Sequence, residues 1–252
     1  MGELLLLLRL EGPLQSWGSR ARWDVRDTGP EPTKSGVIGL LGCAMGVRRE
    51  DSLLEQLDYS LRFAVRADGP GIMATDYHTV SGYHRTAAGD YRVRGGSTLA
   101  VKSLTKAREF KESTIISLRD YLHDARFLIV LGGEDEMLLR QLAGEAPHPD
   151  WPGDLGRPRW PMYLGRKSCV PTRPVLCRLT TEYRDLRHAL FEEHWNPPRH
   201  GVESPATLDG WIECSDGDQE RQDALRVNEG RFYGFRRCQH VEIPTSSLPR
   251  GS

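Results

Sequence analysis

The stretch LLLLLRL, Leu4 to Leu10, decides the fold because it is a continuous apolar run broken only by Arg9. A short run of this kind is typical of a strand that is buried on both faces. It is too short for the apolar core of a signal peptide, and Glu3 stands where such a leader carries positive charge. We therefore expect a central buried strand in a cytoplasmic chain.

Beyond this strand, the stretch PTKSGVIGLLGCAMG, residues 32–46, predicts a helix capped by Ser35. Its Lys34 and repeated glycines suggest a phosphate-binding loop. That loop needs glycine where Thr33 stands, and the prolines before it have no N–H groups to offer. A nucleoside triphosphatase is therefore disfavoured. A helix start with free N–H groups can still hold an anion without such a loop.

The remaining patterns predict an α+β chain in the order strand, helix, strand, insertion, strands, helix, strand. This is the split β-α-β order of a ferredoxin-like domain, which we place over residues 1–187. The insertion, at about 76–113, is predicted as a protruding β-hairpin arm, with a disordered loop as the open alternative. Residues 188–252 are expected to form an irregular acidic extension on or beside the domain. The predicted strands are 59–68, 114–122, 125–133 and 169–183, and the predicted helices are 51–57 and 134–146.

Charge is unevenly distributed although the net charge is only −1. Residues 76–111 carry seven Lys or Arg against three Asp or Glu, and residues 156–187 carry eight against two. Residues 188–229 carry three against ten. Two basic segments that also contain aromatic residues favour an anionic polymer as the partner. The five scattered cysteines include no C-x-x-C pair, and the histidine spacing fits no metal site, so we predict neither metal nor cofactor. No apolar run is long enough to span a membrane.

The motifs LRLEGPLQSWG, PTKSGVIGLLGCAMGVRRED, DYHTV and YLGRKSC resemble the CasD family of type I-E Cascade subunits. That family is a branch of the repeat-associated mysterious protein superfamily in CRISPR antiviral defence. The resemblance covers most of residues 1–175 and fades beyond Leu186. It implies an RNA-recognition-type ferredoxin-like domain that binds and caps the 5′ handle of a CRISPR RNA. The arm of this domain is implied to contact guide RNA and the adjacent backbone subunit. It also implies a hetero-oligomer, with one copy of this chain beside the guide-coating backbone subunits and the large subunit.

The resemblance further implies a subunit that is not an enzyme, so no catalytic residue is assigned. A metal-independent endoribonuclease that processes precursor RNA is the alternative, with Tyr77, His78, His84 and Lys102 as the available acid–base groups. A protein-only scaffold is the second alternative, in which the basic arm binds acidic neighbours.

The predicted RNA contacts come from four places in the chain. The first strand ends in polar groups and a stacking aromatic ring, the helix start offers N–H groups, and the arm and a late turn offer cations. A core role for Trp17, a cap-only role for Ser35 and solvation of Lys34 stay open. The predicted set is Gln15, Ser16, Trp17, Lys34, Ser35, Gly36, Tyr77, His78, Arg92, Arg94, Lys102, Lys106, Arg108, Leu164, Gly165, Arg166, Lys167 and Ser168.

Overall fold

The computed structural model describes residues 2–18, 25–86, 88–95, 97–166, 175–195, 204–227 and 232–250. The chain divides into two units. The first comprises residues 1–19, 28–74 and 121–252, and the second comprises residues 20–27 and 75–120. In the part of the chain that is described, no helix has the length and apolar character needed to cross a membrane.

The first unit is built around β1 (Leu5–Gln15), which confirms the predicted strand. On one side β1 pairs antiparallel with β8 (Lys111–Gly132), and on the other with β9 (Val175–Thr180). Strand β3 (Arg62–Gly69) pairs antiparallel with the far side of β8. The resulting order is β3-β8-β1-β9, with every neighbouring pair antiparallel.

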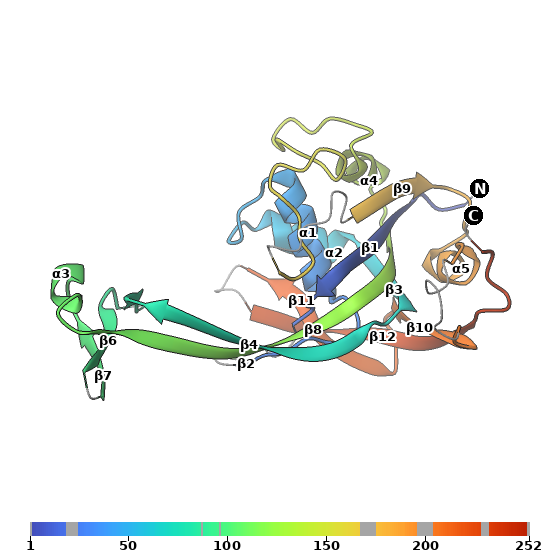
Figure 1. Ribbon diagram of the computed structural model, residues 1–252. Coiled ribbons are helices and arrows are strands. Elements are labelled where there is room, and N and C mark those ends of the chain that lie inside the picture. Colours follow the sequence, from blue (N-terminus) through green and yellow to red (C-terminus); the bar gives the residue numbers. More distant parts are fainter. Residues whose placement is uncertain are drawn as a thin grey trace. The chain divides into compact units, whose positions relative to one another are not determined.

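Helices cover both faces of these strands, which explains the uninterrupted apolar run. Helices α1 (Lys34–Met45), α2 (Leu53–Ser60) and α4 (Glu136–Ala143) lie on one side of these strands (Figure 1). They pack against the even-numbered leucines of residues 4–10. Helix α5 (Leu186–Glu192) packs on the other face, against the odd-numbered ones. Because successive side chains of a strand point to opposite faces, both sets must be apolar.

The predicted irregular C-terminal extension is wrong, because this segment forms three strands. They are β10 (Thr207–Glu213), β11 (Gln219–Arg226) and β12 (Phe232–Pro244), which continue the sheet from β3 in the order β3-β10-β12-β11. The charged residues of this segment alternate with apolar ones, a strand pattern that the sequence prediction missed. Buried residues such as Leu208 and Ile243 alternate with exposed ones, as expected for strands with one buried face.

Two further details differ from the sequence predictions. The strands predicted at 114–122 and 125–133 are one continuous strand, β8, although Asp124 has a positive φ of 54°. Pro13 of β1 lies opposite Asp124 and has no N–H to donate, so no pair forms there. The neighbouring pairs, Gly12 with Ala125 and Leu14 with His123, are intact. Helix α1 is capped by Thr33 and not by Ser35, since the Thr33 hydroxyl accepts a hydrogen bond from the Gly36 N–H at 3.2 Å.

The second unit contains the whole segment predicted as an arm, residues 76–113. It has little core of its own, with Val93 and Ala107 as its fully buried apolar residues within the described segments. Strand β8 runs from this unit into the first. The other elements are β2 (Val25–Arg26), β4 (Ile72–Gly82, shared with the first unit), β5 (His84–Arg85), β6 (Tyr91–Gly95), β7 (Ser97–Val101) and α3 (Leu104–Ala107).

Candidate nucleic-acid interface

The end of β1 and the loop that leads toward β9 come together in the first unit. The Ser16 N–H donates to the Leu164 carbonyl oxygen at 2.9 Å, and Gln15 forms an antiparallel bridge with Gly165. A side chain at Gly165 would lie only 3.0 Å from the Leu14 carbonyl oxygen, so glycine favours this close approach. Two of the predicted motifs are therefore neighbours in space.

Gln15 and Trp17 are core residues in this structure, which corrects their prediction as direct RNA contacts. The Trp17 indole N–H donates to the Gln15 side-chain oxygen at 3.1 Å, and the Gln15 amide donates to the Ala125 carbonyl oxygen at 2.5 Å. Trp17 is only 4% exposed, and its ring packs so closely on Gly36 that a Cβ there would lie 3.1 Å from Cε3. A base cannot stack on this ring, whereas Ser16 between them is half-buried.

The start of α1 is occupied by carboxylates of the chain itself, which corrects the predicted phosphate site at Lys34, Ser35 and Gly36. The backbone N–H of Lys34 donates to an Asp223 carboxylate oxygen at 2.7 Å. The Lys34 ammonium group is buried and donates to Glu213 at 2.9 Å. Because a helix start favours negative charge, these two carboxylates of the acidic segment take the place predicted for RNA.

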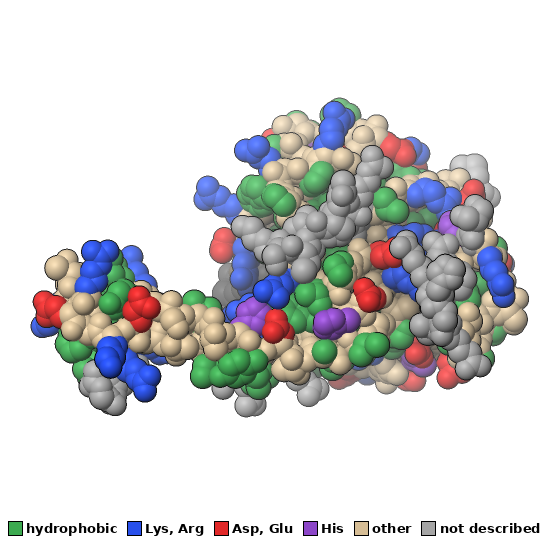
Figure 2. All heavy atoms as spheres, in the orientation of Figure 1, with side chains coloured by type: hydrophobic (Ala, Val, Ile, Leu, Met, Phe, Trp, Pro, Cys, Tyr) green, Lys and Arg blue, Asp and Glu red, His purple; other side chains and the backbone are tan. Residues whose placement is uncertain are grey.

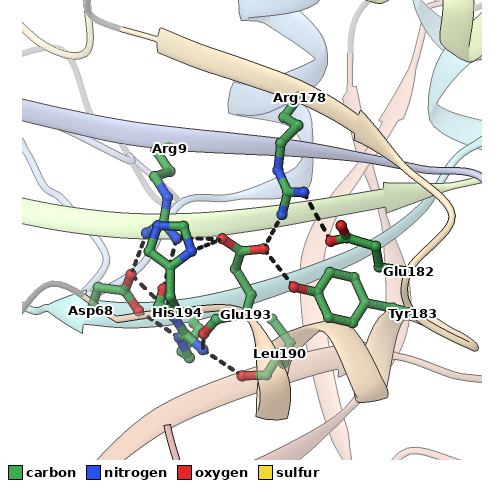
Figure 3. Close-up of polar contacts among 9 residues, drawn as sticks. Arg9, Asp68, Arg178, Glu182, Tyr183, Leu190, Glu193 and His194 are labelled. Carbon is green, nitrogen blue, oxygen red and sulfur yellow. Dashed lines mark hydrogen bonds and ion pairs between the residues drawn. The ribbon is translucent and has the colours of Figure 1, made fainter. Parts of the chain in front are cut away.

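Several other cations of the first unit are also held by internal carboxylates (Figure 3). The buried Glu193 carboxylate accepts hydrogen bonds from Arg9 at 2.7 Å and from the Tyr183 hydroxyl at 2.8 Å, and it contacts Arg178. Arg9 also reaches Asp68, at 3.1 Å. These cations link β1, β9 and α5 and are structural.

The pKa values of this cluster follow from the same contacts. Burial raises the pKa of Glu193, but the bonds from Tyr183 and Arg9 outweigh burial and hold the pKa below its ordinary value. Burial and the neighbouring carboxylate raise the pKa of Tyr183 to about 12. Glu193 therefore stays ionised at neutral pH and holds the Arg9 and Arg178 cations, while the Tyr183 hydroxyl stays protonated and donates to it.

By contrast, the loop over residues 156–166 exposes cations beside aromatic rings. Its backbone is fixed to α1, since the Arg159 N–H donates to the Ala44 carbonyl oxygen at 2.7 Å. Arg157 and Arg159 are exposed, with Trp160 at 40% and Tyr163 at 43% exposure beside them. Cations and accessible rings together suit single-stranded RNA.

The sequence prediction covered this loop only in part. Arg166 is exposed and Leu164 is buried, whereas Lys167 and Ser168 lie outside the described residues. Trp160 was missed, although the sequence RPRW at residues 157–160 signals a tryptophan among cations.

The predicted cations of the second unit are exposed and lie on β6, at the end of β7 and around α3 (Figure 2). Arg92 and Arg94 flank the buried Val93 on β6 and therefore point to the same face. Among the residues that the structure describes, none of the five makes an ion pair with a carboxylate. The five are Arg92, Arg94, Lys102, Lys106 and Arg108.

Tyr77 and His78 lie on opposite faces of β4, because they are consecutive residues of one strand. The His78 Nε2 atom lies 2.8 Å from Asp76, and the His84 Nε2 atom lies 2.9 Å from the Val80 carbonyl oxygen. Tyr77 and His78 therefore cannot act together on one phosphate in this arrangement. Within the described segments, no group of three or more His, Cys, Asp or Glu side chains could hold a metal ion.

Comparisons with known proteins agree on one family. A family model described as CRISPR-associated protein (Cas_Cas5) matches residues 5–233. The chain is 36% identical over 197 residues to the CRISPR system Cascade subunit CasD of Escherichia coli (strain K12), covering 74% of this chain and 75% of that protein.

Two solved structures are also similar to this chain. A chain of a CRISPR RNA-guided surveillance complex has a TM-score of 0.65 and 30% identity, covering 97% of this chain and 92% of that one. A crystal structure of a Cas protein has a TM-score of 0.62 and 32% identity, covering 98% of each chain.

Proposed function

Because the chain belongs to the CRISPR-associated Cas5 family, we propose that it is a non-catalytic subunit of a CRISPR RNA-guided surveillance complex. In this proposal it binds and caps the 5′ handle of the CRISPR RNA. Its partners are the guide-coating backbone subunits and the large subunit, with one copy of this chain per complex. It acts in the cytoplasm, in antiviral defence.

The strand order supports an RNA-recognition-type ferredoxin-like domain. Helices α1 and α2 connect β1 to β3, and α4 connects β8 to β9. Together with the antiparallel order β3-β8-β1-β9, this is the β-α-β-β-α-β arrangement of that fold. In this proposal the second unit is the arm inserted between β3 and the later part of β8.

The single observation that carries RNA binding is the division of the cations into two classes. Buried or half-buried cations such as Lys34 and Arg9 have carboxylate partners within the chain. Arg92 and Arg94 are exposed without a carboxylate partner among the described residues. Cations without protein partners are available to neutralise phosphates. In the first unit, Arg157 and Arg159 are a separate pair of exposed cations with aromatic residues next to them in the loop.

The proposal is tested by the salt dependence of RNA binding. We expect Arg92→Ala with Arg94→Ala to reduce the slope of log affinity against log salt by about 1.4, since each contact to single-stranded RNA contributes about 0.7. The measurement is filter binding of handle-bearing RNA to the free chain and to the assembled complex. The RNA is expected to remain uncut.

The matched control is Arg140→Ala with Arg237→Ala, which removes the same charge from exposed positions. These two cations are paired with Glu145 at 3.3 Å and Glu220 at 3.9 Å, so we expect the slope to stay unchanged. An equal slope for both double variants, or equal affinity for RNA without its handle, would contradict the proposal.

A further inference from the structure

A pocket of about 400 Å³ lies at the C-terminal end of α1, in the first unit. Its apolar part is formed by Met45 of α1, Val47 in the turn that follows, and Leu53 of α2. The segment after α4 brings His148 and Trp151 to the same pocket. The volume lies within the range of roughly 300–1,000 Å³ that is usual for small-molecule sites. None of the predicted RNA-contact residues lines this pocket, so it is separate from the surfaces described above.

Two aromatic rings give the pocket a flat wall. The rings of His148 and Trp151 stack with their centroids 3.8 Å apart and their planes 11° from parallel. Trp151 also packs against the main apolar cluster, which fixes the pair in place. The Asp150 backbone N–H donates to His148 Nδ1 at 3.1 Å, so the ring proton lies on Nε2 and that atom is a donor. A fixed aromatic wall with a donor at its edge suits a flat heterocyclic ligand.

Charged groups of both signs also line the pocket. The side chains of Arg48 and Asp150 are exposed and make no ion pair or hydrogen bond with any residue that the structure describes. Asp51 accepts from the Leu53 N–H at 3.0 Å and adds a second carboxylate. One guanidinium beside two carboxylates disfavours a simple anion, and an apolar ligand would leave these charged groups without partners. The ligand that fits has donors and acceptors as well as an apolar face.

A further cation lies beside the pocket. A Cβ added to Gly46 would lie 2.7 Å from Arg159 Cγ and 2.9 Å from Pro152 Cγ. Because Gly46 and Pro152 both line the pocket, the Arg159 side chain runs along its edge. Arg159 is exposed and has no carboxylate partner among the described residues. Its guanidinium group is therefore available to a phosphate of a ligand held in the pocket.

We propose that this pocket binds one nucleotide, with its base against the wall of His148 and Trp151 and its phosphate at Arg159. A nucleobase has a flat face, and its edge carries both donors and acceptors. Its ring nitrogens and carbonyl oxygens accept from Arg48 and His148 Nε2, and its amino group donates to Asp150. A free nucleotide and one nucleotide of a single strand share this chemistry. The pocket lies at the opposite end of α1 from the predicted phosphate site, so the inference does not rest on the proposed function.

Titration calorimetry of the full chain with each ribonucleoside 5′-monophosphate tests the site. We expect at least one monophosphate to bind about tenfold or more tightly than inorganic phosphate, because the base stacks on the aromatic wall. Arg48→Ala with His148→Ala is expected to weaken this binding by about tenfold or more. The matched control, His84→Ala with Arg237→Ala, removes a half-buried histidine and an exposed arginine elsewhere and should bind as the wild type. Asp150→Asn adds a donor and is expected to change the order of preference among the bases.

A short single-stranded RNA distinguishes the two sources of the nucleotide. Tighter binding of the RNA than of any monophosphate, lost in the pocket variant, assigns the pocket to a strand, and equal binding assigns it to a free nucleotide. The inference is overturned if inorganic phosphate binds as tightly as every monophosphate, if the pocket variant binds as the control does, or if neither nucleotide nor RNA saturates the chain. Failure of the proposed function appears instead in the salt slope of the Arg92 and Arg94 variant, so the two failures are distinguishable.

Discussion

Two glycines of α1, one turn apart, meet different surroundings. A side chain added at Gly42 would lie 2.5 Å from Leu54 Cδ2, so α2 approaches α1 closely at this point. An added side chain at Gly39 would meet no heavy atom within 4 Å. A side chain at position 42 would therefore require Leu54 to move, whereas one at position 39 would not disturb its surroundings.

We expect Gly39→Ala to raise the free energy of unfolding by about 0.5–1 kcal/mol, because alanine favours the helix. Gly42→Ala is expected to lower it by about 1–3 kcal/mol through overpacking against Leu54. Urea unfolding of the two variants measures both effects. Destabilisation by Gly39→Ala would contradict the open space around this position.

Asp58 is a buried acid whose ionisation opposes folding. Burial raises its pKa from 3.8 to about 6, although Lys34 and Arg226 act to lower it. Because the folded chain binds this proton more tightly than the unfolded chain, the stabilising contribution is complete below about pH 4 and is lost as the pH rises through about 6.

Asp58→Asn, which mimics the neutral acid, is therefore expected to match the wild type near pH 4. Near pH 7.5 it should be more stable by about 1–3 kcal/mol, since one pKa unit corresponds to about 1.4 kcal/mol. Unfolding free energies across this pH range test the prediction. A constant difference between the two proteins would contradict the raised pKa.

At the scale of elements, the start of α1 depends on a strand that lies far along the chain. The Asp223 carboxylate of β11 accepts a hydrogen bond from the Lys34 backbone N–H at 2.7 Å. It also accepts two hydrogen bonds from the Arg236 guanidinium of β12, at 2.7 Å and 2.9 Å. Asp223 is buried, and the Arg236 side chain is only 8% exposed. The carboxylate therefore holds α1, β11 and β12 together.

We expect Asp223→Ala to lower the free energy of unfolding by about 3–5 kcal/mol, because it leaves the Arg236 cation buried without its partner. Asp223→Asn retains an oxygen that can cap α1 and is expected to lose less. Denaturant titration gives both values. A loss below about 1 kcal/mol for Asp223→Ala would show that water replaces this contact.

At the scale of the whole molecule, the last described residues complete the core under α5. The backbone N–H of Trp195 donates to the Pro249 carbonyl oxygen at 2.8 Å. Leu248 is buried in the same apolar cluster as Leu5 and Leu190. Residues 245–250 are therefore part of the packed first unit.

Leu248→Ala is expected to lower the free energy of unfolding by about 2–3 kcal/mol, as for other buried leucines. Leu176→Ala is the control, because Leu176 on the edge strand β9 is 53% exposed and should change stability little. Thermal unfolding compares the two. Equal effects would show that the C-terminal residues separate readily from the core.

Local patterns determined the central elements of the fold. The leucine run predicted β1, the alternation over residues 59–68 predicted β3, and the amphipathic segment 134–146 predicted α4. The resemblance of the motifs to known subunits predicted the family to which the chain belongs. Information of this kind lies within about ten neighbouring residues, since strand and helix periods are short.

Only the tertiary structure decided which candidate site residues are available to a ligand. Lys34, Gln15 and Trp17 carry the side chains expected of an RNA contact, but Glu213, Asp223 and the Ala125 carbonyl, all distant in sequence, bind or enclose them. Arg92 and Arg94 have no such partner in the described chain. A cation is available to RNA only when the fold brings no carboxylate to it, and that pairing depends on contacts between residues far apart in the sequence.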